Sequence, residues 1–372
     1  MREAGAIGEM TSLALRKRRA GQRLLVGFDG TSPAPEFVRF VREAAPAGFI
    51  LFARNVEEPA QVRELNRELA ALLPASLPPL LSVDQEGGRV QRVKATRWPT
   101  LRALGNIDHL PTTAQFARAL ADEVRALGFN LNFAPCADVD SNPKNPVIGD
   151  RSFGPDPGQV VRHVAAFVEA AQARGLVCCA KHFPGHGDTS VDSHLDLPTV
   201  ERDRPEIERT ELPPFAAAVQ AGVGMVMTSH VVFPAYDESV PATMSEPILR
   251  GLLRGRLGWG GVTISDDLEM KAVRGRYPLD MQLDLASRAG VDLFCISRSL
   301  DLCVEAWETL VRLQELDPRH DDAATDAQGR LMALRERFFK EAPPAPPVSL
   351  VGDPAHRALA ESLRRQGGDP LS

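Results

Sequence analysis

The chain has 372 residues, of which 44% are hydrophobic and 25% are charged, and its net charge is −6 at pH 7. These proportions are typical of a soluble globular protein with enough apolar material for a large core. Its basic residues are scattered rather than gathered in one segment. This argues against nucleic acid as the main partner, because phosphate binding needs a concentrated basic surface.

The N-terminal segment 1–22 carries charges throughout and has no uninterrupted apolar stretch, so no secretory signal is expected. No run of about 18 apolar residues occurs in the chain, so no membrane span is expected either. The five cysteines are odd in number, two of them are adjacent, and four lie in segments typical of buried strands. Unpaired thiols packed as small hydrophobic groups fit a reducing compartment, and we therefore expect a cytoplasmic protein without disulfides.

Short apolar runs alternate with longer amphipathic segments along nearly the whole chain. The runs are too short and too uniformly apolar for half-exposed strands, so they are interpreted as parallel strands covered on both faces. The predicted strands are Arg23–Phe28, Phe49–Phe52, Leu80–Val83, Asn130–Ala134, Val177–Ala180, Met225–Thr228, Gly261–Ile264 and Asp292–Ile296. Helical spacing of apolar residues predicts helices at Phe116–Leu127, Val160–Ala173, Leu212–Ala221 and Ile248–Leu257.

Eight strands alternating with helices favour a closed (β/α)8 barrel over an open doubly wound sheet. A dinucleotide-binding sheet needs glycines spaced G-x-G-x-x-G after its first strand, and GFDGTSPAP at that place lacks the spacing. We therefore expect a single α/β TIM-type catalytic barrel over residues 1–340. Residues 341–372 begin with a proline-rich run, and we expect a stiff connector followed by a C-terminal tail with one short amphipathic helix.

Polar residues directly follow six of the eight predicted strands. In a (β/α)8 barrel the reacting groups come from these carboxyl ends and from the loops after them. Such a ring of carboxylates, cations and hydroxyl groups suits a neutral polyhydroxylated ligand such as a sugar. In chain order these polar groups are Arg54-Asn55, Asp84-Gln85-Glu86, Lys181-His182, Ser229-His230, Ser265-Asp266-Asp267 and Ser297-Arg298.

The densest group of chemically capable residues is segment 181–194, KHFPGHGDTSVDSH, which holds three of the eight histidines. Gly185 and Gly187 permit backbone angles that other residues avoid. Asp192 and His194 are two residues apart, so in a turn the carboxylate can reach one ring nitrogen of the histidine. Such a pair fixes the tautomer and raises the basicity of an imidazole whose ordinary pKa of about 6.5 already suits proton transfer.

Asp266 follows the predicted strand Gly261–Ile264 and is one of two adjacent aspartates. Neighbouring residues after a buried strand cannot point the same way, so at most one of Asp266 and Asp267 is expected to face the centre. Either one could instead cap the following helix. Glu86 is the only glutamate at a predicted strand end, where it is either a fallback proton donor or an anchor for the arginine of its EGGR turn.

Four blocks of the sequence resemble bacterial β-N-acetylglucosaminidases of glycoside hydrolase family 3. They are SVDQEGGRVQR (82–92), NFAPCADVDSNPKNPVIGDRSFG (132–154), KHFPGHGDTSVDSHLDLP (181–198) and TISDDLEM (263–270). The blocks stand in family order and cover nearly the whole barrel. The resemblance implies a retaining exo-glycosidase that releases terminal N-acetylglucosamine (GlcNAc) from cell-wall muropeptides or related β-linked glycosides through a covalent glycosyl-aspartate.

By this resemblance Asp266 is the nucleophile, and His194, paired with Asp192, is the general acid/base. Asp84 is implied to hold sugar hydroxyls. The residues implied to grip the sugar and its acetamido group are Arg92, Arg151, Lys181 and His182. The implied partner is a small carbohydrate, with no metal, cofactor, nucleic acid or membrane, and a monomer is the default expectation.

Three alternatives to this hydrolase stay open. A neutral imidazole repels an incoming anion less than a carboxylate does, so phosphate could replace water as acceptor, as in a phosphorylase. A metal-dependent barrel hydrolase could use the histidines of segment 181–194, but that class needs His-x-His after the first strand, where this chain has Phe28-Asp29-Gly30. The third alternative is a catalytically inactive barrel that only binds sugar.

Overall fold

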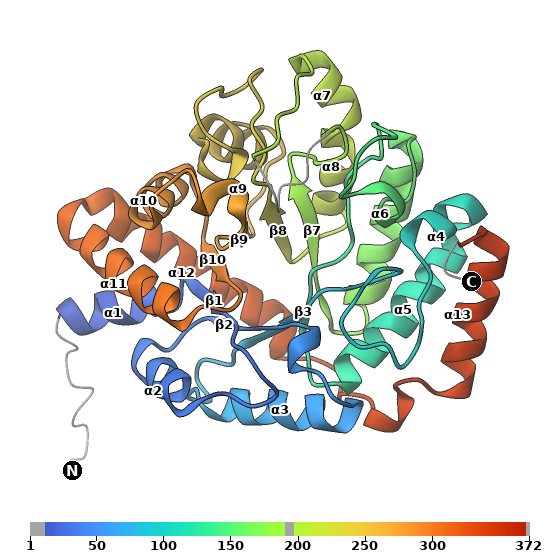
Figure 1. Ribbon diagram of the computed structural model, residues 1–372, viewed down its shortest axis with the longest axis horizontal. Coiled ribbons are helices and arrows are strands. Elements are labelled where there is room, and N and C mark those ends of the chain that lie inside the picture. Colours follow the sequence, from blue (N-terminus) through green and yellow to red (C-terminus); the bar gives the residue numbers. More distant parts are fainter. Residues whose placement is uncertain (1–11, 190–196, 370–372) are drawn as a thin grey trace, which may run out of the picture.

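The computed structural model describes residues 12–189 and 197–369 and contains a closed barrel of eight parallel strands surrounded by helices (Figure 1). Around the ring the strands are ordered β1, β10, β9, β8, β7, β6, β3 and β2. Their bounds are β1 Leu24–Val26, β2 Gly48–Leu51, β3 Leu80–Val83, β6 Leu131–Asn132, β7 Val177–Phe183, β8 Met225–Thr228, β9 Val262–Asp267 and β10 Leu293–Ile296. The predicted (β/α)8 fold is confirmed.

Each predicted strand coincides with one barrel strand, but β7 and β9 continue beyond their predicted ends. Parallel pairing extends as far as Phe183, opposite Thr228 on β8, and Asp267, opposite Cys295 on β10. Both extensions bring polar residues of the candidate site into the barrel wall itself. A site residue held in a paired strand is positioned more rigidly than one in a loop.

Helices form the outer layer of the barrel (Figure 1). Their bounds are α1 Ser12–Gly21, α2 Pro35–Ala44, α3 Pro59–Ala71, α4 Leu101–Ile107, α5 Leu110–Ala126, α6 Pro157–Gln172, α7 Arg204–Thr210, α8 Leu212–Gln220, α9 Lys271–Arg274, α10 Leu279–Ala289, α11 Leu300–Leu316, α12 Pro318–Phe339 and α13 Pro354–Gly367. Three predicted helices correspond to α5, α6 and α8, and the fourth forms a π-helix over Pro247–Arg256. No described helix is both long enough and apolar enough to cross a membrane.

Helix α12 closes the amino-terminal end of the barrel. Its residues Leu331, Leu334 and Phe338 belong to the hydrophobic cluster that fills the barrel interior. Arg335 on the same helix is buried and donates to the carbonyl oxygens of Pro78 and Ala47, just before β3 and β2. Since this end is covered, a ligand has access to the barrel from the carboxyl ends of the strands.

Two strands outside the barrel, β4 (Gln85–Gly87) and β5 (Val90–Gln91), form a hairpin after β3 that the sequence analysis did not predict. Its turn contains Gly87 and Gly88, whose φ angles are +113° and +56°, a region that side chains disfavour. A Cβ atom at Gly87 would lie 2.1 Å from the carbonyl oxygen of Pro99. The two glycines of the EGGR motif therefore allow the hairpin to press against the segment around Pro99.

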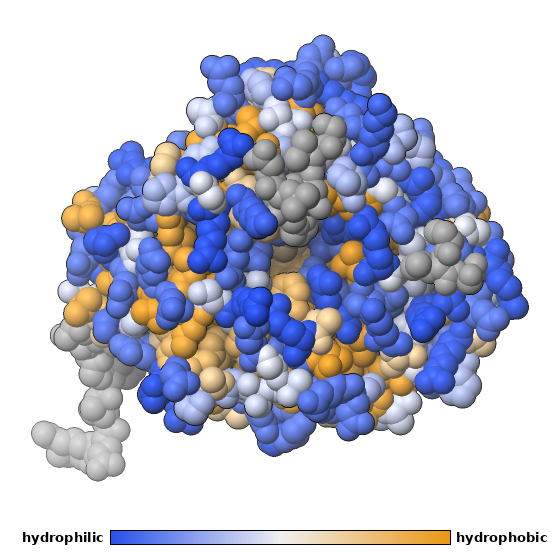
Figure 2. All heavy atoms as spheres, in the orientation of Figure 1, coloured by the Kyte–Doolittle hydropathy of each residue, from blue (hydrophilic) through white to orange (hydrophobic). Residues whose placement is uncertain are grey.

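The chain after α12 runs back along the outside of the barrel. Arg63 on α3 donates to the carbonyl oxygen of Pro346 at 2.9 Å, and Arg125 on α5 donates to the carbonyl oxygen of Pro343. Helix α13 then packs against α4 (Figure 1). In the same view, hydrophilic residues cover most of the rim of the molecule (Figure 2).

Candidate active site

A cavity of about 370 Å³ opens at the carboxyl ends of the barrel strands. The residues implied by the family resemblance to act on or bind the sugar all contribute to its wall, as far as they lie in the described part of the chain. Its charged and imidazole-bearing lining residues are Asp84, Arg89, Arg92, Arg151, Lys181, His182, His186, Asp266 and Asp267. The other two candidates, Asp192 and His194, lie outside the described residues.

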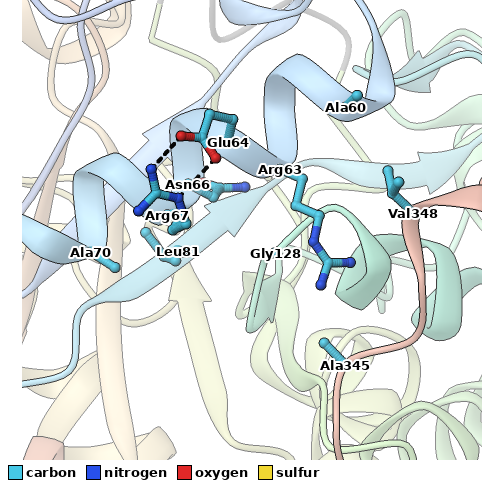
Figure 3. A pocket seen from close by; sticks show the side chains of 10 residues that line it. All are labelled: Ala60, Arg63, Glu64, Asn66, Arg67, Ala70, Leu81, Gly128, Ala345 and Val348. Atoms are coloured by element: carbon cyan, nitrogen blue, oxygen red, sulfur yellow. Dashed lines mark hydrogen bonds and ion pairs between the residues drawn. The ribbon is translucent and has the colours of Figure 1, made fainter.

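A larger cavity of about 430 Å³ lies on the flank of the barrel, between α3 and the C-terminal connector (Figure 3). Its charged groups already have partners. Arg67 pairs with Glu64, and the Arg63 guanidinium donates to the carbonyl oxygens of Ala126 and Pro346, each at 2.9 Å. It contains none of the candidate residues, so size alone does not identify the active site.

Asp84, just beyond β3, is held by two cations. Its carboxylate oxygens lie 2.8 Å from Lys181 Nζ and 3.1 Å from Arg92 Nη2. Burial alone raises the pKa of Asp84, but Lys181 and Arg92 outweigh burial and hold that pKa well below its usual range. Asp84 is therefore ionised at neutral pH, and an ionised carboxylate offers only acceptors, which suits the hydroxyl groups of a ligand.

Glu86 on β4 is buried and is held by Arg151 and by Lys181, the lysine that also holds Asp84. Its oxygens accept from Arg151 Nε and Nη2 at 2.9 and 2.8 Å, and Lys181 Nζ lies 2.6 Å from Oε1. Burial alone raises the pKa of Glu86, but these cations lower it to about 2. Such a group is ionised at neutral pH, which argues against the fallback role as proton donor. Nor does Glu86 anchor the arginine of its own turn, since Arg89 bonds to Asp150 at 2.9 Å.

Asp138, which the sequence analysis missed, holds two histidines, His182 at the end of β7 and His186 just after that strand. Its Oδ2 lies 2.7 Å from His182 Nδ1, and Oδ1 accepts from the backbone N–H of His186 at 2.7 Å. Asp138 is fully buried, and burial alone raises its pKa, but the adjacent histidines lower that pKa. Fixing Nδ1 in this way leaves His182 Nε2 available on the cavity side, 3.5 Å from Arg151 Nη2.

The opposite wall is formed by the end of β9. Asp266 and Asp267 both contribute atoms to the cavity wall. The Asp267 carboxylate accepts from the backbone amides of Glu269 and Ser297, and burial raises its pKa to about 6. His230 is fully buried, with Nε2 3.1 Å from the Asp267 carbonyl oxygen, so it supports the backbone of this wall.

Gly185 lies directly over a buried carboxyl group. A Cβ atom at this glycine would lie 2.4 Å from Glu211 Oε2, and its φ angle is +147°. Burial, together with the nearby charge of Asp138, raises the pKa of Glu211 to about 8. Arg202, whose Nη1 lies 3.6 Å from Glu211 Oε1, opposes this rise only in part, so Gly185 packs on a carboxyl group whose burial favours the neutral form.

Three potential metal ligands lie together among the described residues, with ligand atoms of Cys136, Asp138 and His182 within 4.8 Å of one another. Burial raises the pKa of the Cys136 thiol far above its ordinary value, and its Sγ donates to Asp138 Oδ2 at 3.1 Å. Metal binding requires the thiolate. Because the thiol is held neutral and the carboxylate is already occupied by donors, this group does not fit a metal ion.

Comparison with known proteins agrees with the family resemblance of the sequence blocks. Residues 15–325 match the family described as the glycosyl hydrolase family 3 N-terminal domain. The chain is similar to β-hexosaminidase A of Pseudoalteromonas piscicida, with 35% identity over 364 residues. This alignment covers 90% of the chain but only 60% of that relative, which is considerably longer.

Solved structures agree in fold. A glycoside hydrolase family 3 β-N-acetylglucosaminidase from Paenibacillus sp. str. FPU-7 matches with a TM-score of 0.88 and 37% identity, covering 94% of this chain and 68% of that one. NagZ from Neisseria gonorrhoeae, solved in complex with N-trifluoroacetyl-D-glucosamine, matches with a TM-score of 0.73 and 28% identity. That alignment covers 93% of this chain and 98% of NagZ.

Proposed function

The chain belongs to glycosyl hydrolase family 3, and from that premise we propose that it is a retaining exo-β-N-acetylglucosaminidase of the β-hexosaminidase type. The observation that carries this proposal is the meeting of Asp84, Lys181 and Asp266 in one cavity at the carboxyl end of the barrel. Asp84 is an ionised acceptor for hydroxyl groups, Lys181 is a fixed cation, and Asp266 is a carboxylate able to attack carbon. Two of the relatives named above are called β-hexosaminidase A and β-N-acetylglucosaminidase.

In the proposed complex, the terminal sugar lies between the β3 and β9 walls. Asp84 accepts hydrogen bonds from its hydroxyl groups, since its two cations keep it ionised. Arg92, Arg151, Lys181 and His182 grip the sugar and its acetamido group. Because buried salt bridges fix most of these side chains before a ligand arrives, binding costs little rearrangement.

The proposed reaction has two steps. Asp266 attacks the anomeric carbon while His194 protonates the departing glycosidic oxygen, which leaves a covalent glycosyl-aspartate. His194 then takes a proton from water, whose oxygen attacks the same carbon and releases Asp266. Two inversions restore the β configuration. Asp192 is proposed to stabilise the imidazolium form of His194, as the sequence resemblance implies.

We also propose the biological setting and the division of the chain. Residues 1–340 form the catalytic barrel, and residues 341–372 form its connector and tail. All five cysteines are free and buried, which fits a reducing compartment, so we place the protein in the cytoplasm. A terminal GlcNAc on a muropeptide is the proposed substrate there, in keeping with peptidoglycan recycling.

The proposal is tested by product analysis on 4-nitrophenyl N-acetyl-β-glucosaminide, chitobiose and a muropeptide. We expect free GlcNAc, released first as the β anomer; the α anomer as first product would rule out retention. The assay is repeated in phosphate buffer, where formation of GlcNAc 1-phosphate would identify a phosphorylase instead. Full activity in EDTA is expected, and its loss would favour the metal-dependent alternative.

A further inference from the structure

A buried carboxylate, Glu123 on α5, is one of the groups that join the C-terminal tail to the barrel. This side chain accepts four hydrogen bonds. Two come from the tail, from Gly352 N at 2.9 Å and His356 Nδ1 at 3.0 Å. Two come from the segment before α4, from Thr96 Oγ1 at 2.5 Å and Trp98 Nε1 at 3.0 Å. Glu123 is only 4% exposed, so each lost donor would leave a buried acceptor unsatisfied.

The segment from Thr96 to Thr100, named here the bracket, lies between the tail and the β4–β5 hairpin. The ring of Trp98 lies 5.6 Å from that of His356 on its tail side. A second contact from the tail reaches the bracket at Thr100, whose backbone N–H donates to Asp369 Oδ2 at 2.8 Å. The bracket is therefore held by the tail at two separate places.

On its other side the bracket fixes the backbone of the hairpin. The Trp98 carbonyl oxygen accepts from Gly88 N at 3.0 Å, and Trp98 N donates to Gln91 Oε1 at 3.2 Å. The bracket backbone at Pro99 lies so close to Gly87 that no Cβ fits between them. A displacement of the bracket would therefore displace the turn of the hairpin.

The hairpin in turn positions two residues at the proposed sugar-binding site, Glu86 and Arg92. Glu86 lies within it and holds Arg151 and Lys181. Arg92 follows β5 directly, and its backbone N–H donates to Gln85 Oε1 at 2.9 Å while its guanidinium pairs with Asp84. The contacts thus run without a gap from His356 in the tail to the cavity.

From this chain of contacts we propose that the C-terminal tail is a positioning element for substrate binding, acting through Glu123 and the bracket on the β4–β5 hairpin. His356 is then a positioning residue that touches no substrate. Loss of its bond to Glu123 loosens the hairpin and weakens the grip on the sugar. Among the described residues, the contacts cited for this path involve no residue of β9, so turnover of bound substrate is expected to change little.

The test is His356→Ala, with Arg365→Ala as a matched control on an exposed position of the same helix, where Arg365 pairs with the exposed Glu361. We expect KM for 4-nitrophenyl N-acetyl-β-glucosaminide to rise about fivefold in His356→Ala, with kcat within about twofold, because coupling through contacts is usually modest. His356→Asn, which keeps a donor near the Nδ1 position, is expected to restore KM. Arg365→Ala should match wild type.

Hydrogen exchange provides a readout that needs no activity. Amides of residues 85–92 should exchange faster in His356→Ala than in Arg365→Ala. Faster exchange confined to α13, with KM unchanged, would overturn the proposal by showing a purely local role for His356. Trp98→Phe gives a second route, since it keeps an aromatic side chain and removes the Nε1 donor to Glu123. It should reproduce both effects, and a wild-type result would count against the bracket. The KM readout rests on the proposed function, whereas the exchange readout does not.

Discussion

The two walls of the cavity hold their carboxylates in opposite ways. On the wall formed by β3, β4 and β7, cations lower the pKa of Asp84 and Glu86 despite burial. On the wall at the end of β9, Asp267 is held by backbone amides, and burial raises its pKa to about 6. The two acids of the first wall are therefore ionised at neutral pH. The second wall contains an acid, Asp267, whose pKa lies close to neutral pH.

The difference matches the work proposed for each wall. A binding wall gains from charges that are fixed before the ligand arrives, because little rearrangement then opposes binding. A wall that takes part in the reaction must tolerate a change of charge. Many permanent cations around its nucleophile would make the carboxylate less reactive. The predictions below test this division.

The largest effect is expected for Asp266→Ala. The proposed nucleophile has no substitute, so kcat should fall by about a thousandfold or more while KM for the same substrate changes little. Steady-state kinetics on 4-nitrophenyl N-acetyl-β-glucosaminide measure both constants, with circular dichroism to verify folding. Turnover equal to wild type would refute the assignment and revive the reading as a sugar-binding barrel.

Lys181→Met should disrupt the ion pairs of the wall that is proposed to bind the sugar. Removal of this cation leaves Asp84 and Glu86 with one partner each in a buried site, and breaking such a pair typically costs about 3–5 kcal/mol. We expect a lower unfolding midpoint in urea and a KM raised by about a hundredfold. Lys144→Met, at an exposed position, is the control. Equal effects of the two substitutions would show that Lys181 has no special role.

The wall formed by β3, β4 and β7 should also make the free energy of unfolding depend on pH in the acidic range. The pKa of Glu86 is about 2 in the folded chain against an ordinary 4.5, so the unfolded chain binds the proton more readily between these values. Its contribution to stability is present above pH 4.5 and is lost as pH falls towards 2. Glu86→Gln should flatten the unfolding free energy over this window, measured by urea titration. An unchanged slope would contradict the ionised state of Glu86.

The wall at the end of β9 should also make the free energy of unfolding depend on pH, with a smaller slope of the opposite sign. The pKa of Asp267 rises from 3.8 to about 6 on folding, so the folded chain holds the proton more tightly. This contribution is present below pH 3.8 and is lost as pH rises through 6. In Asp267→Asn, which can keep both accepted amide bonds, that slope should vanish in the same urea titrations. A slope that survives would assign the titration to another group.

The strands and the set of cavity residues could be predicted because they leave local signals. Buried parallel strands are uniformly apolar, and the barrel places whatever follows them at one mouth. Asp84, Lys181 and Asp266 therefore meet as expected, although they are far apart in the chain. The extensions of β7 and β9 were missed because strand pairing, rather than hydrophobicity, sets their ends.

The supporting contacts could not be predicted in the same way. Asp138 is one aspartate among several in its block, and its bonds to His182 and His186 depend on how β6 and β7 pack. Glu123 looks like an ordinary helix residue, and its four donors come from two segments far from it in the chain, the tail and the segment before α4. Such roles arise from tertiary contacts that no local pattern encodes.

Glu86 also bears on the order in which the barrel assembles. Its partners Arg151 and Lys181 lie far along the chain, the first of them 65 residues away. Enclosing this carboxylate before both cations arrive would strand an uncompensated charge in the interior, which is strongly unfavourable. Closure of this part of the barrel and completion of the sugar-binding wall should therefore occur together and late, as contacts of long sequence separation generally do. A chain that has closed its barrel has in the same step acquired its binding wall.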